Sequence, residues 1–152
     1  MIAETESFTV GVFKDVEWAR KGVEALRRHG FAPSTLSILV KATPETAKLA
    51  EEVVGQPASA LDLPRVGPVV AGGPLVAALG NGLPGDLPAR GIAGTMRRVG
   101  FQAHDGEIYE RLTAAGGVLI AVHSEPRAAD ALAVFHNYGG GNAAIGAWHG
   151  RV

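Results

Sequence analysis

The fold is decided by residues 8–40, which read FTVGVFKDVEWARKGVEALRRHGFAPSTLSILV. Apolar side chains recur at every second position over residues 8–13, which is the period of a β-strand. From Asp15 onward they recur at spacings of three and four, so they form one stripe of a helix that Gly30 can end. A second alternating run over residues 36–40 predicts another strand. The segment therefore predicts a strand, helix, strand unit.

A second copy of this pattern stands in the last third of the chain. Residues 119–122 predict a strand, Ser124 caps the helix that follows, and residues 143–148 predict a final strand. The spacing between the glycines that end the two helices also separates their capping residues, which indicates two structurally equivalent halves. Two βαβ halves on one sheet predict an α+β, ferredoxin-like fold, in which two helices cover one face of four strands.

The 152 residues fit a single domain, in which the halves over residues 8–40 and 104–148 leave residues 41–103 as an insertion. A connection of this length must hold structure of its own. We expect it to be helical and rich in glycine, with a helix that ends at Gly55 and a proline-broken connection over residues 56–68.

Composition excludes several classes of function. The chain has no cysteine, which removes thiolate catalysis, disulfide frameworks and zinc ribbons. Its formal net charge is -1, so no strong field attracts nucleic acid. The first residues lack the basic and apolar regions of a secretory signal, and prolines and glycines interrupt the longest weakly charged stretch. We therefore expect a cytoplasmic protein without a nucleic-acid partner, and we do not expect membrane association.

Three segments together resemble the bacterial general stress proteins of the YflT-like, heat-induced stress protein family. They are VGPVVAGGPLVAAL at residues 66–79, TVGVFKDVEWARKGVEALRRHGF at residues 9–31 and GEIYERLTAAGGVLIAV at residues 106–122. The resemblance covers about residues 8–139. It implies a soluble or peripheral bacterial protein associated with stress, with no established reaction, cofactor or catalytic residue to carry over. The insertion is shorter and more broken by proline than the long Gly/Ala hairpin of some members, which argues against membrane association here.

The glycine-rich part of the insertion combines small residues, which let backbones approach closely, with apolar residues that supply contact. Such a segment needs a partner surface. It either packs on its own sheet, over the face that the two helices leave bare, or forms a homodimer around a two-fold axis. Insertion into a membrane is the weakest alternative. The residues predicted to mediate self-association are Val69, Val70, Gly72, Gly73, Leu75, Val76 and Leu79.

Polar side chains at the ends of the two central strands form a candidate ligand site. We expect these strands to run parallel, which would bring Lys14 and His123 together at one edge of the sheet. Because Ser124 caps the helix that follows, this edge could hold a small anion at a helix N-terminus. The alternative is that these side chains are simply solvated at strand ends.

The histidines offer one weak metal site. Only His29, His136 and His149 can converge in the expected topology, and a zinc-type site needs three or four ligands at about 2.0 to 2.2 Å. Surface or helix-capping roles are the alternative, and we predict no cofactor. The G-x-G-x-x-G pattern over residues 80–85 lacks the preceding strand that a dinucleotide site requires.

The sequence thus predicts a non-catalytic, stress-associated protein that forms a homodimer through its insertion. No nucleophile, base and orienting group come together in the expected fold, which argues against an enzyme. Glu107 and Glu110 fall on one helical stretch with a packing role, and Arg97 with Arg98 forms a solvated basic face. The alternative function is a small-ligand or metal-binding sensor that uses the lysine and histidine residues at the strand ends.

Overall fold

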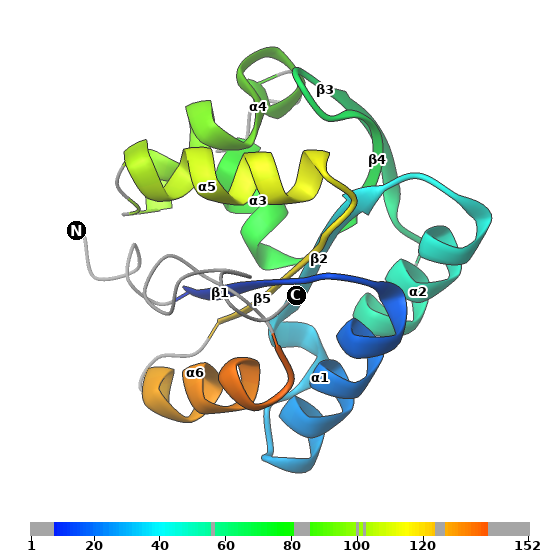
Figure 1. The fold of residues 1–152 in the computed structure, drawn as a ribbon, viewed down its shortest axis with the longest axis vertical. Helices are drawn as coiled ribbons and strands as arrows, with labels where there is room; N and C mark the ends of the chain where they lie inside the picture. The colour runs from blue at the N-terminus through cyan, green and yellow to red at the C-terminus, as the bar shows by residue number, and fades with distance from the viewer. Residues whose placement is uncertain are drawn as a thin grey trace.

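An antiparallel sheet of five strands carries helices on both of its faces (Figure 1). The computed structural model describes residues 8–55, 57–80, 86–99, 101, 103–123 and 127–139. The strands lie in the order β1-β5-β2-β4-β3 and are β1 (Phe8–Phe13), β2 (Leu36–Lys41), β3 (Ser59–Leu63), β4 (Gly67–Gly72) and β5 (Val118–His123). The helices are α1 (Val16–Arg28), α2 (Pro44–Val54), α3 (Pro74–Gly80), α4 (Asp86–Met96), α5 (Ala103–Ala114) and α6 (Ala128–Asn137), with short 3-10 turns at η2 (Pro33–Thr35) and η3 (Arg97–Val99).

Local sequence signals fix the ends of α1 and α2. The Asp15 carboxylate accepts a hydrogen bond of 2.9 Å from a first-turn amide of α1, and Gly30 follows the helix with φ of 91°. Thr43 and Thr46 form a reciprocal capping box at the start of α2, and Gly55 ends it in the left-handed conformation. Both helix stops and the Asp15 cap confirm the prediction.

Alternation along the interior strand β5, which lies between β1 and β2, divides the core into two. Val118, Ile120 and Val122 pack with residues of α1, α2 and α6, whereas Leu119 and Ala121 pack with residues of α3, α4 and α5. All five side chains are buried. A strand that is buried on both faces needs a continuous apolar run, and β5 supplies one. The sheet is therefore the middle of three layers (Figure 1).

The segment expected to be an insertion belongs to the sheet. β4 pairs antiparallel with β2, where Val70 lies opposite Val40, and β3 pairs with β4 beyond it. The α+β class is confirmed, but the expected ferredoxin-like layout of four strands is not, because the sheet has five strands. The prediction missed both strands of this hairpin. They form because the valines of β4 bury their side chains on both faces of the sheet.

Parts of the prediction fall on residues that the structure does not describe. These are the last predicted strand over residues 143–148, the capping Ser124 and His149. Within the described ranges, no helix has the length and apolar character needed to cross a membrane.

Candidate functional site

The predicted anion site at the strand ends is wrong, because β1 and β5 run antiparallel. Phe8 lies opposite His123, and Phe13, which precedes Lys14, lies opposite Val118. Five residues of β-strand span about 17 Å, so Lys14 and His123 lie at opposite ends of the strand pair. The His123 ring instead packs edge-on against Phe8, with ring centroids 5.0 Å apart.

The predicted histidine cluster is only partly described. His29 forms the C-cap of α1, where its Nδ1 lies 2.8 Å from the carbonyl oxygen of Ala25. His136 is exposed in the last turn of α6, and His149 lies outside the described residues. Among the residues that the structure describes, no three His, Cys, Asp or Glu side chains gather where they could hold a metal ion. The capping alternative therefore accounts for His29.

The predicted self-association surface is largely buried inside the chain's own core. Val69, Leu75 and Leu79 are at most 1 % exposed and pack under α4 and α5, while Val70 packs on the other face of the sheet. The remaining three residues of the set, Gly72, Gly73 and Val76, are half-buried. Four of the seven residues are therefore buried in the chain's own core, as in the alternative that the segment packs on its own sheet. Self-association itself stays a prediction.

Gly73 explains how this segment reaches the sheet so closely. Its φ is 104°, and a Cβ at this position would collide with the carbonyl oxygen of Leu36 and with Ser37. The buried Ser37 hydroxyl accepts a hydrogen bond of 2.8 Å from the Leu75 amide at the start of α3. Glycine thus lets α3 begin directly on β2, with a side chain of the strand as its cap.

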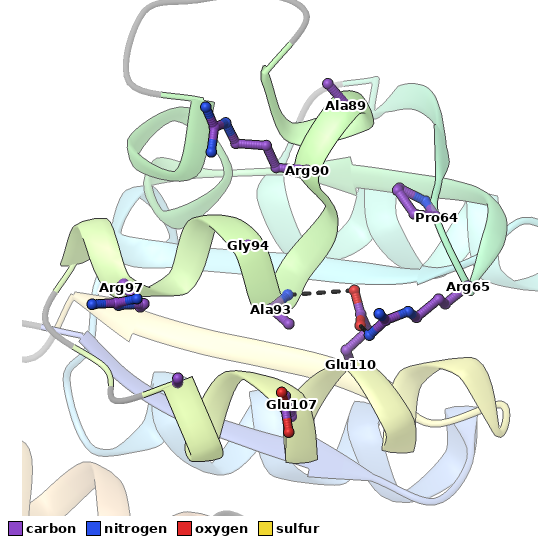
Figure 2. Close-up of a pocket in the computed structure, with 10 residues that line it drawn as sticks. Pro64, Arg65, Ala89, Arg90, Ala93, Gly94, Arg97, Glu107 and Glu110 are labelled. Atoms are coloured by element: carbon purple, nitrogen blue, oxygen red, sulfur yellow. Dashed lines mark hydrogen bonds and ion pairs between the residues drawn. The ribbon is translucent and has the colours of Figure 1, made fainter.

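The best candidate for a functional site is a pocket of about 370 Å³ between α4, α5 and the β3–β4 turn (Figure 2). Its size falls in the range of small-molecule sites. Its wall combines small residues with a cluster of arginines and glutamates. The lining residues are Pro64, Arg65, Ala89, Arg90, Ala93, Gly94, Arg97, Ala103, Glu107 and Glu110.

A buried carboxylate anchors this wall. Glu110 of α5 is only 4 % exposed, and its Oε1 lies 3.1 Å from Nη1 of Arg65 in the β3–β4 turn. Its Oε2 accepts a hydrogen bond of 3.4 Å from the Ala93 amide of α4. A buried charge is tolerated when it is paired and hydrogen-bonded. Glu110 therefore ties three chain segments together at one point (Figure 2).

A break in α4 creates the amide that Glu110 binds. Gly91 has φ of 76° and ψ of −176°, so the helix stops there and restarts at the next residue. The first amides of a restarted helix have no intrahelical acceptor, and Glu110 supplies one to Ala93. A Cβ at Gly91 would lie 2.8 Å from Glu110 Oε2, so only glycine leaves room for the carboxylate. The break and the buried acid therefore fit each other.

The helices α4 and α5 come close beside the pocket. A Cβ at Gly106 of α5 would lie 3.2 Å from Met96 Cβ and 3.3 Å from Ala93 Cα. A side chain at position 106 would therefore be crowded, and the absence of one in Gly106 lets the two backbones come close. Glu107, which follows Gly106 in α5, and Arg97, which follows Met96 and begins η3, both line the pocket.

Charges at the rim of the pocket are not all used by the fold. Arg90, Arg97 and Glu107 are exposed. Among the residues that the structure describes, the side chains of Arg97 and Glu107 have no hydrogen-bond or ion-pair partner. The pocket thus has a wall in which Arg65 and Glu110 form an ion pair. At its rim, Arg97 and Glu107 carry opposite charges that have no partner among the described residues.

A second hollow, of about 320 Å³, lies between α1 and α2 but offers less. Arg20 pairs with Glu52 at 3.1 Å, and Arg27 donates to the backbone carbonyls of Glu52 and Val53. These bonds join the two helices. Most of its polar groups are therefore already committed to the fold.

Sequence reasoning missed the pocket because it assigned Glu107 and Glu110 to packing and Arg97 to a solvated face. Their spacing of three does place the two glutamates on one face of a helix. The missing signal was Arg65, which comes from a hairpin that the sequence pattern did not reveal.

Comparison with known proteins adds no constraint. No protein-family model, no curated protein and no solved structure matches the chain. The resemblance to the YflT-like stress proteins therefore stays a prediction.

Proposed function

We propose that the protein is a non-catalytic binding protein that holds a small charged ligand in the pocket between α4 and α5. The observation that carries this proposal is the unpaired rim: Arg97 and Glu107 face one hollow without a partner among the described residues. A ligand would supply the missing charge-assisted hydrogen bonds, which are the strong ones in proteins. The sequence analysis gave a small-ligand-binding protein as its alternative function, with the site at the strand ends. The present proposal keeps ligand binding and places it in the pocket between α4 and α5.

The lining chemistry favours binding over catalysis. None of the described residues that line the pocket carries a hydroxyl, thiol or imidazole group. Catalysis by an activated hydroxyl or thiol needs one of these groups beside a base. The carboxylate of Glu110 is hydrogen-bonded to Arg65 and to the Ala93 amide, so both of its oxygens are already bonded within the wall of the pocket. Self-association and the link to stress stay predictions that these contacts do not address.

A blocked pocket tests the proposal. Ala103 is exposed at the start of α5 and lines the pocket, so Ala103→Trp should fill it. Ala47 is also exposed, on α2, which packs on the other face of the sheet, so Ala47→Trp is the matched control. Both variants and the parent would be screened by thermal unfolding against phosphate, acetate, citrate, spermidine and free amino acids.

A ligand at 100 times its Kd stabilises the folded state by about 2.7 kcal/mol, which corresponds to about 5–11 °C in Tm for a chain of this size. We expect at least one compound of the panel to produce such a rise in the parent and in Ala47→Trp, and not in Ala103→Trp. Equal rises in both tryptophan variants, or no rise with any compound, would refute the proposal.

A further inference from the structure

The charged groups around the pocket divide into committed and uncommitted ones. Arg65 and Glu110 neutralise each other in the wall, at 3.1 Å. Arg97 and Glu107 carry opposite charges, line the same pocket from η3 and α5, and pair with no described residue. Each has a flexible stem and lies at the rim (Figure 2). Arg90, which also lines the pocket, makes an interaction of its own. The two groups without a partner among the described residues, Arg97 and Glu107, therefore sum to no net charge but form a dipole.

This dipole selects against singly charged ligands. An anion drawn to Arg97 meets the carboxylate of Glu107 across the same hollow, and a cation drawn to Glu107 meets the guanidinium of Arg97. Like charges brought together in a partly desolvated site repel. A molecule with both an anionic and a cationic group satisfies both ends and adds no net charge.

From these charges we infer that the ligand class is a zwitterion of the α-amino acid type, an inference that rests on the proposed function. Its carboxylate binds the Arg97 guanidinium, whose planar fork suits two parallel hydrogen bonds to a carboxylate. Its ammonium group binds the Glu107 carboxylate. Three alanines and Gly94 also line the pocket, so it leaves room for a small side chain on the ligand.

Three matched probes test the ligand class with the full-length protein. They are L-alanine, N-acetyl-L-alanine, which lacks the cationic group, and L-alaninamide, which lacks the anionic one. Affinity is measured by titration calorimetry and by the shifts of backbone amides in NMR spectra. We expect L-alanine to bind, and each probe that lacks one charge to bind about 10-fold to 100-fold more weakly, because each loses one charge-assisted contact.

Two charge-removing variants assign the ends of the ligand. Arg97→Gln should weaken L-alanine and N-acetyl-L-alanine, whereas Glu107→Gln should weaken L-alanine and remove its advantage over N-acetyl-L-alanine. Arg111→Gln and Glu51→Gln are controls, since both residues are exposed helix residues that do not line the pocket. Neither control should change the order of the three probes. Because Arg97 and Glu107 are exposed and unpaired, all four variants should fold.

The outcomes separate this inference from the proposed function. If citrate, acetate or phosphate binds in the pocket and is blocked by Ala103→Trp while L-alanine does not bind, the proposed function stands and the zwitterion inference is overturned. If L-alanine binds but Glu107→Gln leaves its advantage over N-acetyl-L-alanine unchanged, the inference is also overturned. If nothing binds in the pocket, both fail.

Discussion

Removal of the Arg65 side chain tests whether the buried carboxylate of Glu110 depends on it. The Arg65 side chain is 75 % exposed and that of Glu110 is 6 % exposed, so the ion pair is buried from one side only. In Arg65→Ala the carboxylate keeps the Ala93 amide but loses its counter-charge. A buried polar group that loses its partner costs about 1–3 kcal/mol. Because water reaches the Arg65 side, we expect a loss of about 1–2 kcal/mol in the free energy of unfolding.

The backbone at this position does not confound the comparison. Arg65 has φ of 70°, which is unfavourable for any residue with a Cβ. Alanine and arginine share this cost, so it cancels between the two proteins. The difference between them therefore reports the side chain.

Urea unfolding followed by circular dichroism measures the loss. Arg20→Ala is the control, because Arg20 and Glu52 form an ion pair of the same length whose side chains are 43 % and 44 % exposed. Such exposed pairs contribute about 0–1 kcal/mol. Arg65→Ala made in a Glu110→Gln background should cost less than in the parent, because no buried charge is left unpaired. A loss no larger than that of Arg20→Ala, or an equal loss in both backgrounds, would refute the reasoning.

Three further substitutions probe the rest of the structure. Gly91→Ala should lower the free energy of unfolding by about 2 kcal/mol or more, because its φ and ψ suit glycine alone and its Cβ would meet Glu110; an unchanged urea midpoint would contradict this. Ser37→Ala should cost about 1–2 kcal/mol in thermal unfolding, since the Leu75 amide loses its acceptor; no loss would mean that α3 needs no cap. Leu75→Ala should cost about 2–5 kcal/mol, with the same sedimentation coefficient as the parent. Altered sedimentation at unchanged stability would restore this residue to a self-association surface.

The sequence was sufficient where the signal is local. A helix cap, an apolar stripe and a terminal glycine lie within about a dozen residues of each other, so Asp15 and Gly30 were enough to bound α1. The same local logic found the end of α2 at Gly55. These features depend on short-range hydrogen bonds and on backbone conformations that residue type alone restricts.

The hairpin of β3 and β4 was not recognisable in the same way. Its strands are short, glycine stands at both ends of β4, and Pro68 lies within it, which together resemble a loop. What makes β4 a strand is its pairing with β2, a contact that is remote in the sequence. Burial on both faces also gives it a run of valines without alternation.

The predicted anion site at the strand ends was wrong because the relative direction of β1 and β5 was wrong. Both Lys14 and His123 do lie at strand ends, and their strands are neighbours. The period of apolar residues identifies a strand. It does not show whether that strand runs parallel or antiparallel to its neighbour. The antiparallel pairing places the two side chains at opposite ends of the strand pair.

The pocket combines two roles that fall on different residues. Arg65 adopts a positive φ that is unfavourable for a residue with a Cβ, and it pairs with the buried carboxylate of Glu110. Gly91, which adopts positive φ without that penalty, lies beside the same carboxylate. Strain of this kind collects at functional sites, because the surrounding structure must over-determine it. Arg97 and Glu107 lie beside this fixed wall and contribute nothing to it. We therefore expect wall substitutions to change the free energy of unfolding, whereas rim substitutions should change only the affinity for the proposed ligand.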